Sequence, residues 1–485
     1  MKTQVTDYSM YVAGEWTSGW STARMDATSP ATGEVIGTFP EGTREDVRRA
    51  IAAASGAWYG WATRSAFERA AAMERIVEIM RERREDLAWT LTLDQGKPLA
   101  AEAYDEVDEL IEYFRMAAAD ATRLDGLMPP SVDAGKRVFL YRVPRGVVGV
   151  ISPWNWPYTM PAEAIAPALA SGNAVVWVPA PSTSVCAVKL AACITDAGLP
   201  AGLFNMITGP GSVVGDEVAA NPGTQAVAFI GSIETGQKVA ARAAGKALLL
   251  EMGGNGPMVI LDDADLDAVA QESLTSAFLG AGQSCTAGER FLVHERVYDS
   301  FLDGLGVAME REVRLGDPFA SDTTLGPLNN EPTAEKMDQH VSDALERGAE
   351  LLAGGARAKG FPTDLYYRPT VLGKVTAEMR VSKEETFGPV VPATVIRDEE
   401  EAIRAVNSSP YGLLSAVFTR DLARGLRFAE KVRTGWVNIN TSSNHWESHL
   451  PFGGRAGSRS GVGRVGGRYP METFTEFKTV ILTVG

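Results

Sequence analysis

The sequence contains few cysteines and histidines. Three cysteines and four histidines occur among 485 residues. Three scattered thiols cannot build a disulfide framework, which favours a reducing compartment and predicts a cytoplasmic protein. The spacing of the histidines and cysteines fits no common metal site, so we expect no bound metal. Cys186 and Cys193 fall on one face of an expected helix, where small core residues are typical.

Positive charge is also in deficit, and long apolar runs are missing. Lys and Arg number 46 against 61 for Asp and Glu, which gives a net charge of -15. Nucleic acid and anionic membrane surfaces repel such a chain, so we expect neither as a partner. No apolar run reaches the roughly 18 residues of a membrane-spanning helix, and residues 1–5 begin no targeting segment.

The composition is that of an ordinary globular chain, and its pattern is α/β. With 45% hydrophobic and 22% charged residues among 485, about three domains are expected. Near-continuous apolar runs alternate with helical segments, which is typical of a parallel sheet covered on both faces. The runs occupy residues 146–151, 174–178, 203–208, 226–230 and 247–250. A second α/β pattern starts at Met258, and an Ala-, Glu- and Arg-rich tract at 65–93 predicts one long helix.

Cys285 lies in the stretch around which we expect the site to form. Small residues and glycines surround it in residues 282–290, after a helical run, so its thiol can be approached. The thiolate is the nucleophilic form, and because a free thiol has a pKa of about 8.5, the surroundings must favour the anion. A buried apolar cysteine is the alternative interpretation.

Two further polar residues have the setting that acyl chemistry needs. Glu251 follows an apolar run and precedes two glycines, so its carboxylate can face a cleft and act as a general base for water. Asn155 is held between prolines and tryptophans in residues 152–157, where a fixed side-chain amide is a good oxyanion donor. The alternatives are a salt-bridged glutamate at a strand end and an asparagine that caps a turn.

Six motifs occur in a fixed order along the chain. Besides residues 282–290, they are Pro153-Trp154-Asn155-Trp156-Pro157, Phe229–Gly236, Leu249–Asn255, Glu385–Pro389 and Pro451–Gly454. Together they resemble the aldehyde dehydrogenase superfamily over nearly the whole chain, which is a strong signal although each motif alone is weak. The resemblance implies an NAD(P)-dependent oxidoreductase that converts a small-molecule aldehyde into the free carboxylic acid.

The resemblance also implies an α/β fold in three parts. A Rossmann-like parallel-sheet cofactor domain would comprise residues 1–122 and 143–252, and a second α/β catalytic domain residues 253–450. A small β bridging element would comprise residues 123–142 and 465–485. In this family the bridging element pairs with a neighbouring subunit, so we expect a homodimer or homotetramer.

Positions that bind the nicotinamide cofactor are carried over from the family in the same way. They are Ser152, Trp154, Val178, Pro181, Gly211, Gly215, Phe229, Gly231, Ser232, Glu385 and Phe387. Val178 and Pro181 stand where the family usually has a lysine and a glutamate that contact the adenosine ribose. The missing glutamate would accept ribose hydroxyls and the missing lysine would bind a 2′-phosphate. Because a phosphate without a cation is the worse mismatch, NAD is expected in preference to NADP.

The resemblance places a substrate tunnel along five further residues. They are Trp156, Met160, Glu163, Trp446 and Phe452, which predict an aromatic, confined channel, with plain core packing as the alternative for each. His445 and His449 flank Trp446. They either select an aldehyde with a polar or anionic far end or make only local turn and packing contacts.

The implied mechanism uses three of these groups. Cys285 attacks the aldehyde, Asn155 and the Cys285 backbone N–H hold the oxyanion, and Glu251 activates the water that hydrolyses the thioester. Relatives that acylate coenzyme A commonly lack a carboxylate at the position of Glu251, so water is the expected acceptor. A coenzyme A-acylating or semialdehyde dehydrogenase branch and a non-catalytic structural member of the fold are the alternatives.

Overall fold

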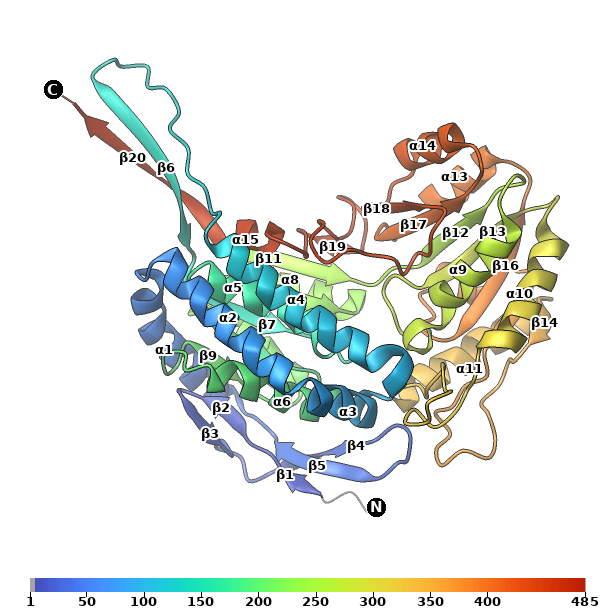
Figure 1. The fold of residues 1–485 in the computed structure, drawn as a ribbon, viewed down its shortest axis with the longest axis horizontal. Helices are drawn as coiled ribbons and strands as arrows, with labels where there is room; N and C mark the ends of the chain where they lie inside the picture. Colours follow the sequence, from blue (N-terminus) through green and yellow to red (C-terminus); the bar gives the residue numbers. More distant parts are fainter. Residues whose placement is uncertain (1–4, 485) are drawn as a thin grey trace.

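The computed structural model describes residues 5–484 as two lobes side by side, with a two-stranded arm that extends away from one of them (Figure 1). Residues 1–4 and 485 lie outside the described range. The expectations for a targeting segment at residues 1–5 and for a bridging element that ends at residue 485 therefore fall partly outside it. The predicted α/β class is confirmed in both lobes. Within the described range no helix is long and apolar enough to cross a membrane.

The first lobe is built on an eight-stranded sheet of order β19-β11-β10-β7-β8-β9-β2-β3. Its five central strands are parallel and buried, as continuous apolar runs favour, and β2, β3 and β19 add antiparallel edges. The strands are β2 (Met10–Val12), β3 (Glu15–Thr17), β7 (Val147–Ile151), β8 (Ala174–Val178), β9 (Phe204–Met206), β10 (Ala226–Gly231), β11 (Ala247–Met252) and β19 (Gly461–Val462). A separate three-stranded sheet contains β1 (Thr6–Asp7), β4 (Arg24–Thr28) and β5 (Val35–Pro40).

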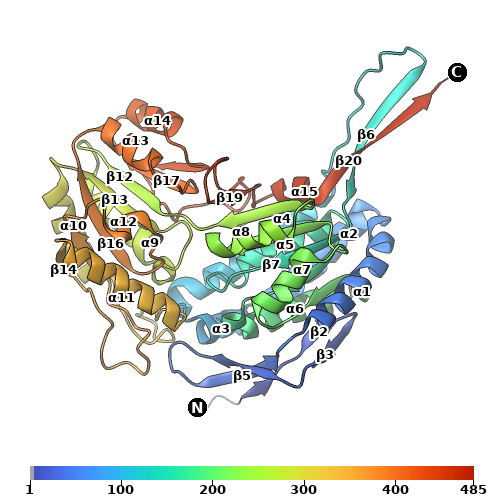
Figure 2. The same ribbon diagram turned by 180° about the vertical axis from the view of Figure 1, so that it is seen from behind.

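Helices cover both faces of the large sheet. Because parallel crossovers are right-handed, α5 and α6 cover one face and α7 and α8 the other. Figure 1 shows α2 and α4 in front of the sheet, and Figure 2 shows α7 and α8 from behind. The helices of this lobe are α1 (Arg44–Ala62), α2 (Ala66–Glu82), α3 (Arg84–Gln95), α4 (Tyr104–Ala121), α5 (Thr159–Ala170), α6 (Ser184–Asp196), α7 (Asp216–Ala220), α8 (Ile233–Arg242) and α15 (Tyr469–Phe474). Cys186 and Cys193 are buried in its core on α6, as predicted.

The prediction of one helix over residues 65–93 is wrong. The chain breaks at Arg83, which has φ −101° and ψ 10° and separates α2 from α3. Helix propensity is high on both sides of the break, but α2 packs mainly on α4 whereas α3 packs about equally on α4 and α6. Arg83 also forms an ion pair with Asp196 at 2.6 Å. Tertiary packing therefore overrides local propensity at this residue.

The second lobe contains a seven-stranded sheet of order β14-β15-β16-β13-β12-β17-β18, with apolar clusters on both faces. All pairings are parallel except that of β14 with β15. The strands are β12 (Gly256–Ile260), β13 (Gly288–His294), β14 (Glu350–Ala353), β15 (Thr370–Gly373), β16 (Val390–Ile396), β17 (Leu414–Phe418) and β18 (Trp436–Ile439). The helices are α9 (Leu266–Phe278), α10 (Tyr298–Glu312), α11 (Glu331–Glu346), α12 (Arg380–Lys383), α13 (Glu399–Asn407) and α14 (Leu422–Lys431).

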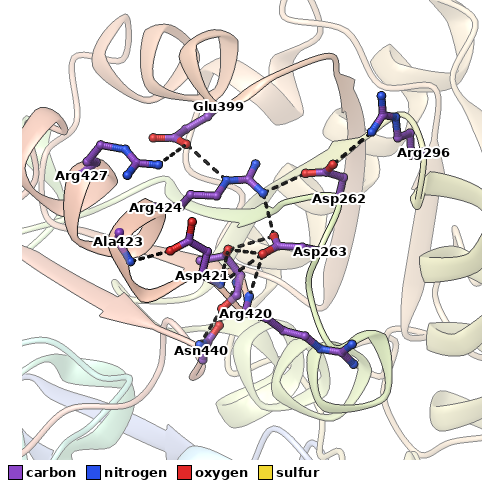
Figure 3. Close-up of polar contacts among 11 residues, drawn as sticks. Asp262, Asp263, Arg296, Glu399, Arg420, Asp421, Ala423, Arg424, Arg427 and Asn440 are labelled. Atoms are coloured by element: carbon purple, nitrogen blue, oxygen red, sulfur yellow. Dashed lines mark hydrogen bonds and ion pairs between the residues drawn. The ribbon is translucent and has the colours of Figure 1, made fainter.

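A cluster of charged residues lies at the carboxyl end of β12. Arg424 of α14 contacts Asp262 and Asp263 at 2.9 Å each and Glu399 at 3.4 Å (Figure 3). One guanidinium thus ties α14 to the segment after β12 and to the first turn of α13. The opposite, amino end of β12 connects directly to the first lobe through β11.

The arm consists of β6 (Lys136–Pro144) and β20 (Thr475–Thr483), paired antiparallel along their whole length (Figure 1). Apart from Thr475, every residue of β20 is exposed, including the apolar residues Phe477, Val480, Ile481 and Leu482. A lone two-stranded ribbon is marginally stable in water, so these exposed apolar side chains indicate a surface that another sheet can cover.

Candidate active site

Two cavities meet at Cys285 between the lobes. The first encloses about 390 Å³ and the second about 650 Å³, and Cys285 and Met160 line both. The carboxyl ends of β7, β10 and β11 lead into the second cavity, as expected for ligand sites in parallel sheets. Cys285 comes from the other lobe, where it precedes β13. Its side chain is partly buried.

A sharp turn after α9 sets the direction of the loop that carries Cys285. Gly280, Ala281 and Gly282 have φ values of 60°, 56° and 73°, which is the left-handed region. Ala281 is uncommon there because its Cβ is crowded, and such strain clusters at functional sites. A Cβ at Gly282 would lie 2.3 Å from the Gly388 carbonyl oxygen, so only glycine fits. The turn redirects the chain so that Cys285 faces the junction of the cavities.

Gln283 fixes this loop to the first lobe. The Asn155 Nδ2 donates to the Gln283 carbonyl at 2.9 Å, and Gln283 Oε1 accepts the Asn329 backbone N–H at 2.9 Å. An amide nitrogen carries two hydrogens, so Asn155 retains one for a ligand. The Cys285 backbone N–H donates to no acceptor within residues 5–484. Two donors beside the thiol are therefore available to a developing oxyanion.

Asn444 holds the other side of the loop and was missed by sequence reasoning. Its Oδ1 accepts from the Ser284 hydroxyl at 2.8 Å and the Thr286 hydroxyl at 2.5 Å, on either side of Cys285. Its Nδ2 donates to the Thr275 and Ser276 carbonyls at the end of α9. No local motif marks this asparagine, because its partners are distant in sequence.

Glu251 lies on β11 with 3% of its surface exposed, and its Oε1 has no hydrogen-bond partner among residues 5–484. Burial, and then the nearby charge of Glu163, raises its pKa well above the ordinary value. Burial, together with the charges of Glu251 and Glu385, likewise raises the pKa of Cys285 well above its ordinary value. The expectation that the surroundings favour the thiolate is therefore not met, since the groups closest to the thiol are carboxylates.

The second cavity gathers charged and aromatic groups from both lobes. Trp154 and Phe387 meet edge to face with centroids 5.6 Å apart. Glu385 Oε1 accepts the Gly254 N–H at 2.9 Å, and a Cβ at Gly253 would lie 2.3 Å from the same oxygen. Burial raises the pKa of Glu385 to about 7, against the opposing charge of Lys336.

Sequence reasoning missed three residues around this cavity. Lys336 and Thr333 of α11 line it. Glu289 supports it from β13 by accepting the Thr386 and Phe387 backbone N–H groups at 2.9 and 2.6 Å. Glu289 belongs to residues 282–290, the stretch that contains Cys285. A charged residue directly after Gly288 was the signal in the sequence that could have indicated its role.

The predicted cofactor positions divide into two groups. Trp154, Gly231, Ser232, Glu385 and Phe387 line the second cavity. The others do not line it: Ser152, Val178, Pro181 and Phe229 lie in or just after strands of the same sheet, and Gly211 and Gly215 are the ends of a short helix that follows β9.

Among the positions in this second group, the side chains differ in what they can offer a ligand. The Ser152 hydroxyl accepts from Trp177 Nε1 at 2.9 Å, and Val178 is 2% exposed. Gly211 begins the short helix Gly211–Gly215, with open space where a Cβ would stand.

All five predicted substrate residues line the first cavity. Trp156 and Trp446 meet edge to face at 6.0 Å, and Met160, Glu163 and Phe452 complete the set. Further lining residues that sequence reasoning missed are Tyr113, Ser284, Thr286, Glu447, Leu450 and Gly466.

Neither of the two histidines lines the first cavity. The side chains of His445 and His449 are 52% and 59% exposed and lie 3.9 and 3.6 Å from Glu447. His445 lines a neighbouring cavity together with Trp156 and Trp446, so a place at the substrate mouth stays a prediction beside the local-contact alternative.

No metal site accompanies the thiol. Within the described part of the chain, no group of three or more His, Cys, Asp or Glu side chains is arranged to hold a metal ion. The groups that do lie at the junction are a thiol, two hydrogen-bond donors and a buried carboxyl.

Comparison with known proteins agrees with this arrangement. The model of the "Aldehyde dehydrogenase family" matches residues 16–480. The chain is 38% identical to the 3-sulfolactaldehyde dehydrogenase of Pseudomonas putida, over 97% of this chain and 96% of that protein. It is also 38% identical to the NADP(+) succinate-semialdehyde dehydrogenase of Escherichia coli strain K12, over 96% of each.

Two solved structures extend the match to the fold. Succinate-semialdehyde dehydrogenase from Burkholderia pseudomallei has a TM-score of 0.95 at 39% identity and 98% coverage of both chains. NAD-dependent aldehyde dehydrogenase from Sinorhizobium meliloti has a TM-score of 0.95 at 36% identity, with 100% of this chain and 96% of that chain covered. The chain therefore belongs to the aldehyde dehydrogenase family and is an enzyme that oxidises an aldehyde to the acid with a nicotinamide cofactor.

Proposed function

We propose that Cys285 is the nucleophile of this oxidation, Asn155 the oxyanion donor and Glu251 the general base. The observation that carries the proposal is the position of the thiol where the two cavities meet. One cavity is aromatic and confined, which suits an aldehyde, and the other combines charged and aromatic groups, which suits a nucleotide. A group at their junction can bond to a substrate on one side while a cofactor lies on the other.

The residues of the second cavity fit a nicotinamide nucleotide. Glu385 offers carboxylate oxygens to ribose hydroxyls, and Trp154 and Phe387 offer aromatic surface beside a planar ring. Lys336 supplies the only cation among the described lining residues of this cavity. When bound, the nicotinamide accepts the hydride that the aldehyde carbon loses.

The covalent step begins when the Cys285 thiol loses its proton to solvent and its Sγ bonds to the aldehyde carbon. The carbonyl oxygen becomes an oxyanion, which accepts hydrogen bonds from Asn155 Nδ2 and the Cys285 N–H. Loss of hydride restores the C=O bond and leaves a thioester on Cys285. Glu251 then takes a proton from water as the water attacks, and the thiolate leaves with release of the acid.

Oxidation to the free acid is supported over acyl transfer to coenzyme A. The buried carboxyl of Glu251 interacts with the Cys285 thiol, so a general base for water already stands beside the thioester carbon. A semialdehyde substrate is the second candidate, because the Escherichia coli and Burkholderia pseudomallei relatives are named for succinate semialdehyde.

A panel of aldehydes with NAD or NADP and without coenzyme A tests this function. We expect reduced cofactor to accumulate, with kcat/KM for NAD at least tenfold above that for NADP, because Val178 and Pro181 offer no cation to a 2′-phosphate. Turnover only after coenzyme A is added would overturn the proposed role of water. A preference for NADP would overturn the cofactor assignment alone.

We also propose that the arm joins two copies of this chain. Strand β20 is exposed along nearly its whole length, and a second copy supplies the same surface for self-complementary pairing. A homodimer or homotetramer is therefore expected in solution.

Ile481→Asp tests the arm. Ile481 is 60% exposed on β20, and a charge at a covered apolar contact costs several kcal/mol, so we expect the particle mass from light scattering to fall toward that of a monomer. Val307→Asp is the matched control, because Val307 is 65% exposed on α10, away from the arm. A wild-type protein that is already monomeric would contradict the proposal.

A further inference from the structure

The first cavity contains no cation to receive an acidic substrate. Its described lining includes two carboxyl groups, Glu163 and Glu447, and no lysine, arginine or histidine. The sulfolactaldehyde and succinate-semialdehyde dehydrogenases among the relatives are named for aldehydes whose far end is a sulfonate or a carboxylate. In this cavity such an end would meet like charge without a partner, which is strongly unfavourable once water is excluded.

Glu163 is the deepest charged group of the cavity. It lies on α5 with 6% of its surface exposed, and its Oε1 accepts from the Tyr113 hydroxyl at 2.6 Å. Its second oxygen, Oε2, is buried and has no hydrogen-bond partner within the described residues. Burial raises the pKa of Glu163 to about 8. A buried carboxyl with a free oxygen in an otherwise apolar cavity has one acceptor position left for a ligand.

The aromatic residues that line the first cavity and the charged residues around it favour a positively charged ligand. Trp156 and Trp446 present aromatic rings to the cavity, and aromatic faces attract quaternary and primary ammonium groups. Behind Trp446, its Nε1 donates to Glu109, another buried carboxyl. The nearby cation is Lys97, which lies over the Trp156 ring with Nζ 3.4 Å from its centroid and is paired with Glu106. Its charge is thus already neutralised.

We propose that the first cavity selects aldehydes whose far end carries a cation, with Glu163 as the residue that determines this specificity. The inference rests on the proposed function, because it assigns a substrate class to the same site. The carboxylate and the tryptophan rings together replace the water lost by an ammonium group, whereas an uncharged end gains only the apolar contacts.

Three aldehydes with the same three-methylene spacer separate the possibilities. Trimethylammonio-butanal carries the cation, its tert-butyl isostere has the same shape without charge, and glutarate semialdehyde carries a carboxylate. We expect kcat/KM to fall in that order, with the cation at least tenfold above the isostere. Glu163→Gln should lower the ratio of cation to isostere at least tenfold. Glu447→Gln is the matched control, since the Glu447 side chain is 52% exposed and its charge is screened, so the ratio should change less.

The pH dependence of the same ratio is a second readout. The titratable groups that face Glu163 are Tyr113 and Glu109 of α4, Glu251 of β11 and Cys285. Titration of Glu251 and Cys285 changes kcat/KM for the cationic aldehyde and for its isostere by the same factor, so it cancels in their ratio. Because only the ionised carboxylate attracts the cation, the wild-type ratio should rise with pH and level off above about 8, and in Glu163→Gln it should stay flat.

Binding without turnover separates this inference from the proposed function. The alcohols that correspond to the cationic aldehyde and its isostere cannot be oxidised through the thioester route, and calorimetry measures their affinities for wild type and Glu163→Gln. Tighter binding of the cationic alcohol to wild type, lost in the variant, supports the inference even if no aldehyde is turned over. Equal binding of both alcohols, or glutarate semialdehyde as the best of the three substrates, would overturn it. A melting temperature of Glu163→Gln close to wild type confirms that the variant is folded.

Discussion

Cys285→Ala is expected to abolish aldehyde oxidation while leaving the cofactor bound. Alanine removes the atom that forms the thiohemiacetal and the thioester, and no second nucleophile among the described residues lines both cavities. Loss of a covalent route raises the barrier by several kcal/mol, so kcat should fall by more than about a hundredfold. The rate of cofactor reduction measures the loss, and calorimetric titration with NAD measures the retained binding.

Cys193→Ala is the matched control for this experiment. Cys193 is buried on α6 in the core of the first lobe and lines neither cavity. Its replacement removes a thiol and a little core volume, so it should alter stability without a large effect on kcat. If Cys285→Ala keeps more than about a hundredth of the wild-type rate, Cys285 is not the nucleophile.

Glu251→Gln is expected to give one burst of reduced cofactor and then to stall. The amide keeps the shape of the side chain but cannot take a proton from water, so the thioester persists. The first turnover should survive, because loss of the Glu251 carboxylate removes a charge that raises the pKa of Cys285. Stopped-flow mixing measures the burst, whose amplitude should equal the concentration of active sites.

The steady state of Glu251→Gln decides between two roles for this residue. Turnover close to wild type would mean that another group activates water. Absence of both burst and turnover would mean that Glu251 is needed before the thioester forms, as the acceptor of the thiol proton. Only a burst followed by a slow phase agrees with a principal role in hydrolysis.

Motifs that are short and local predicted their parts of the molecule well. The parallel sheet was evident because strands buried on both faces must be continuously apolar, as in residues 174–178. Trp154 and Gly231 were expected near a ligand because they follow strands β7 and β10 at the edge where ligands of parallel sheets lie, and both line the second cavity. The five substrate residues were predicted from the resemblance of six motifs to the aldehyde dehydrogenase superfamily.

Features that depend on contacts between distant segments could not be predicted. Lys336 lies on a helix whose sequence resembles any amphipathic surface helix, and only the packing of α11 brings it to the cavity. The pKa of Cys285 was expected to fall, but burial, and then two carboxylates far from it in sequence, raise it. The break at Arg83 lies between two halves of a helical tract that divide their packing differently between α4 and α6.

His445 and His449 show that the direction of a loop side chain could not be predicted from the sequence either. A histidine pair beside Trp446 suggested polar recognition, since nothing in the sequence tells which way a loop side chain turns. In the structure both rings are exposed, and Glu163, from a helix with an unremarkable apolar pattern, lies in the cavity instead. The position of Glu163 in the cavity was expected from the sequence, but the specificity role that we propose for it was not.

Intact-protein mass spectrometry of Glu251→Gln, mixed with NAD and an aldehyde and quenched after the burst, tests the covalent mechanism most directly. We expect one adduct per chain with the mass of the aldehyde less two hydrogens, located by peptide mapping on the segment that contains Cys285, because hydride and proton have left and the acyl group remains. An unmodified chain after a full burst of reduced cofactor, or an acyl group on any other residue, would contradict a thioester on Cys285.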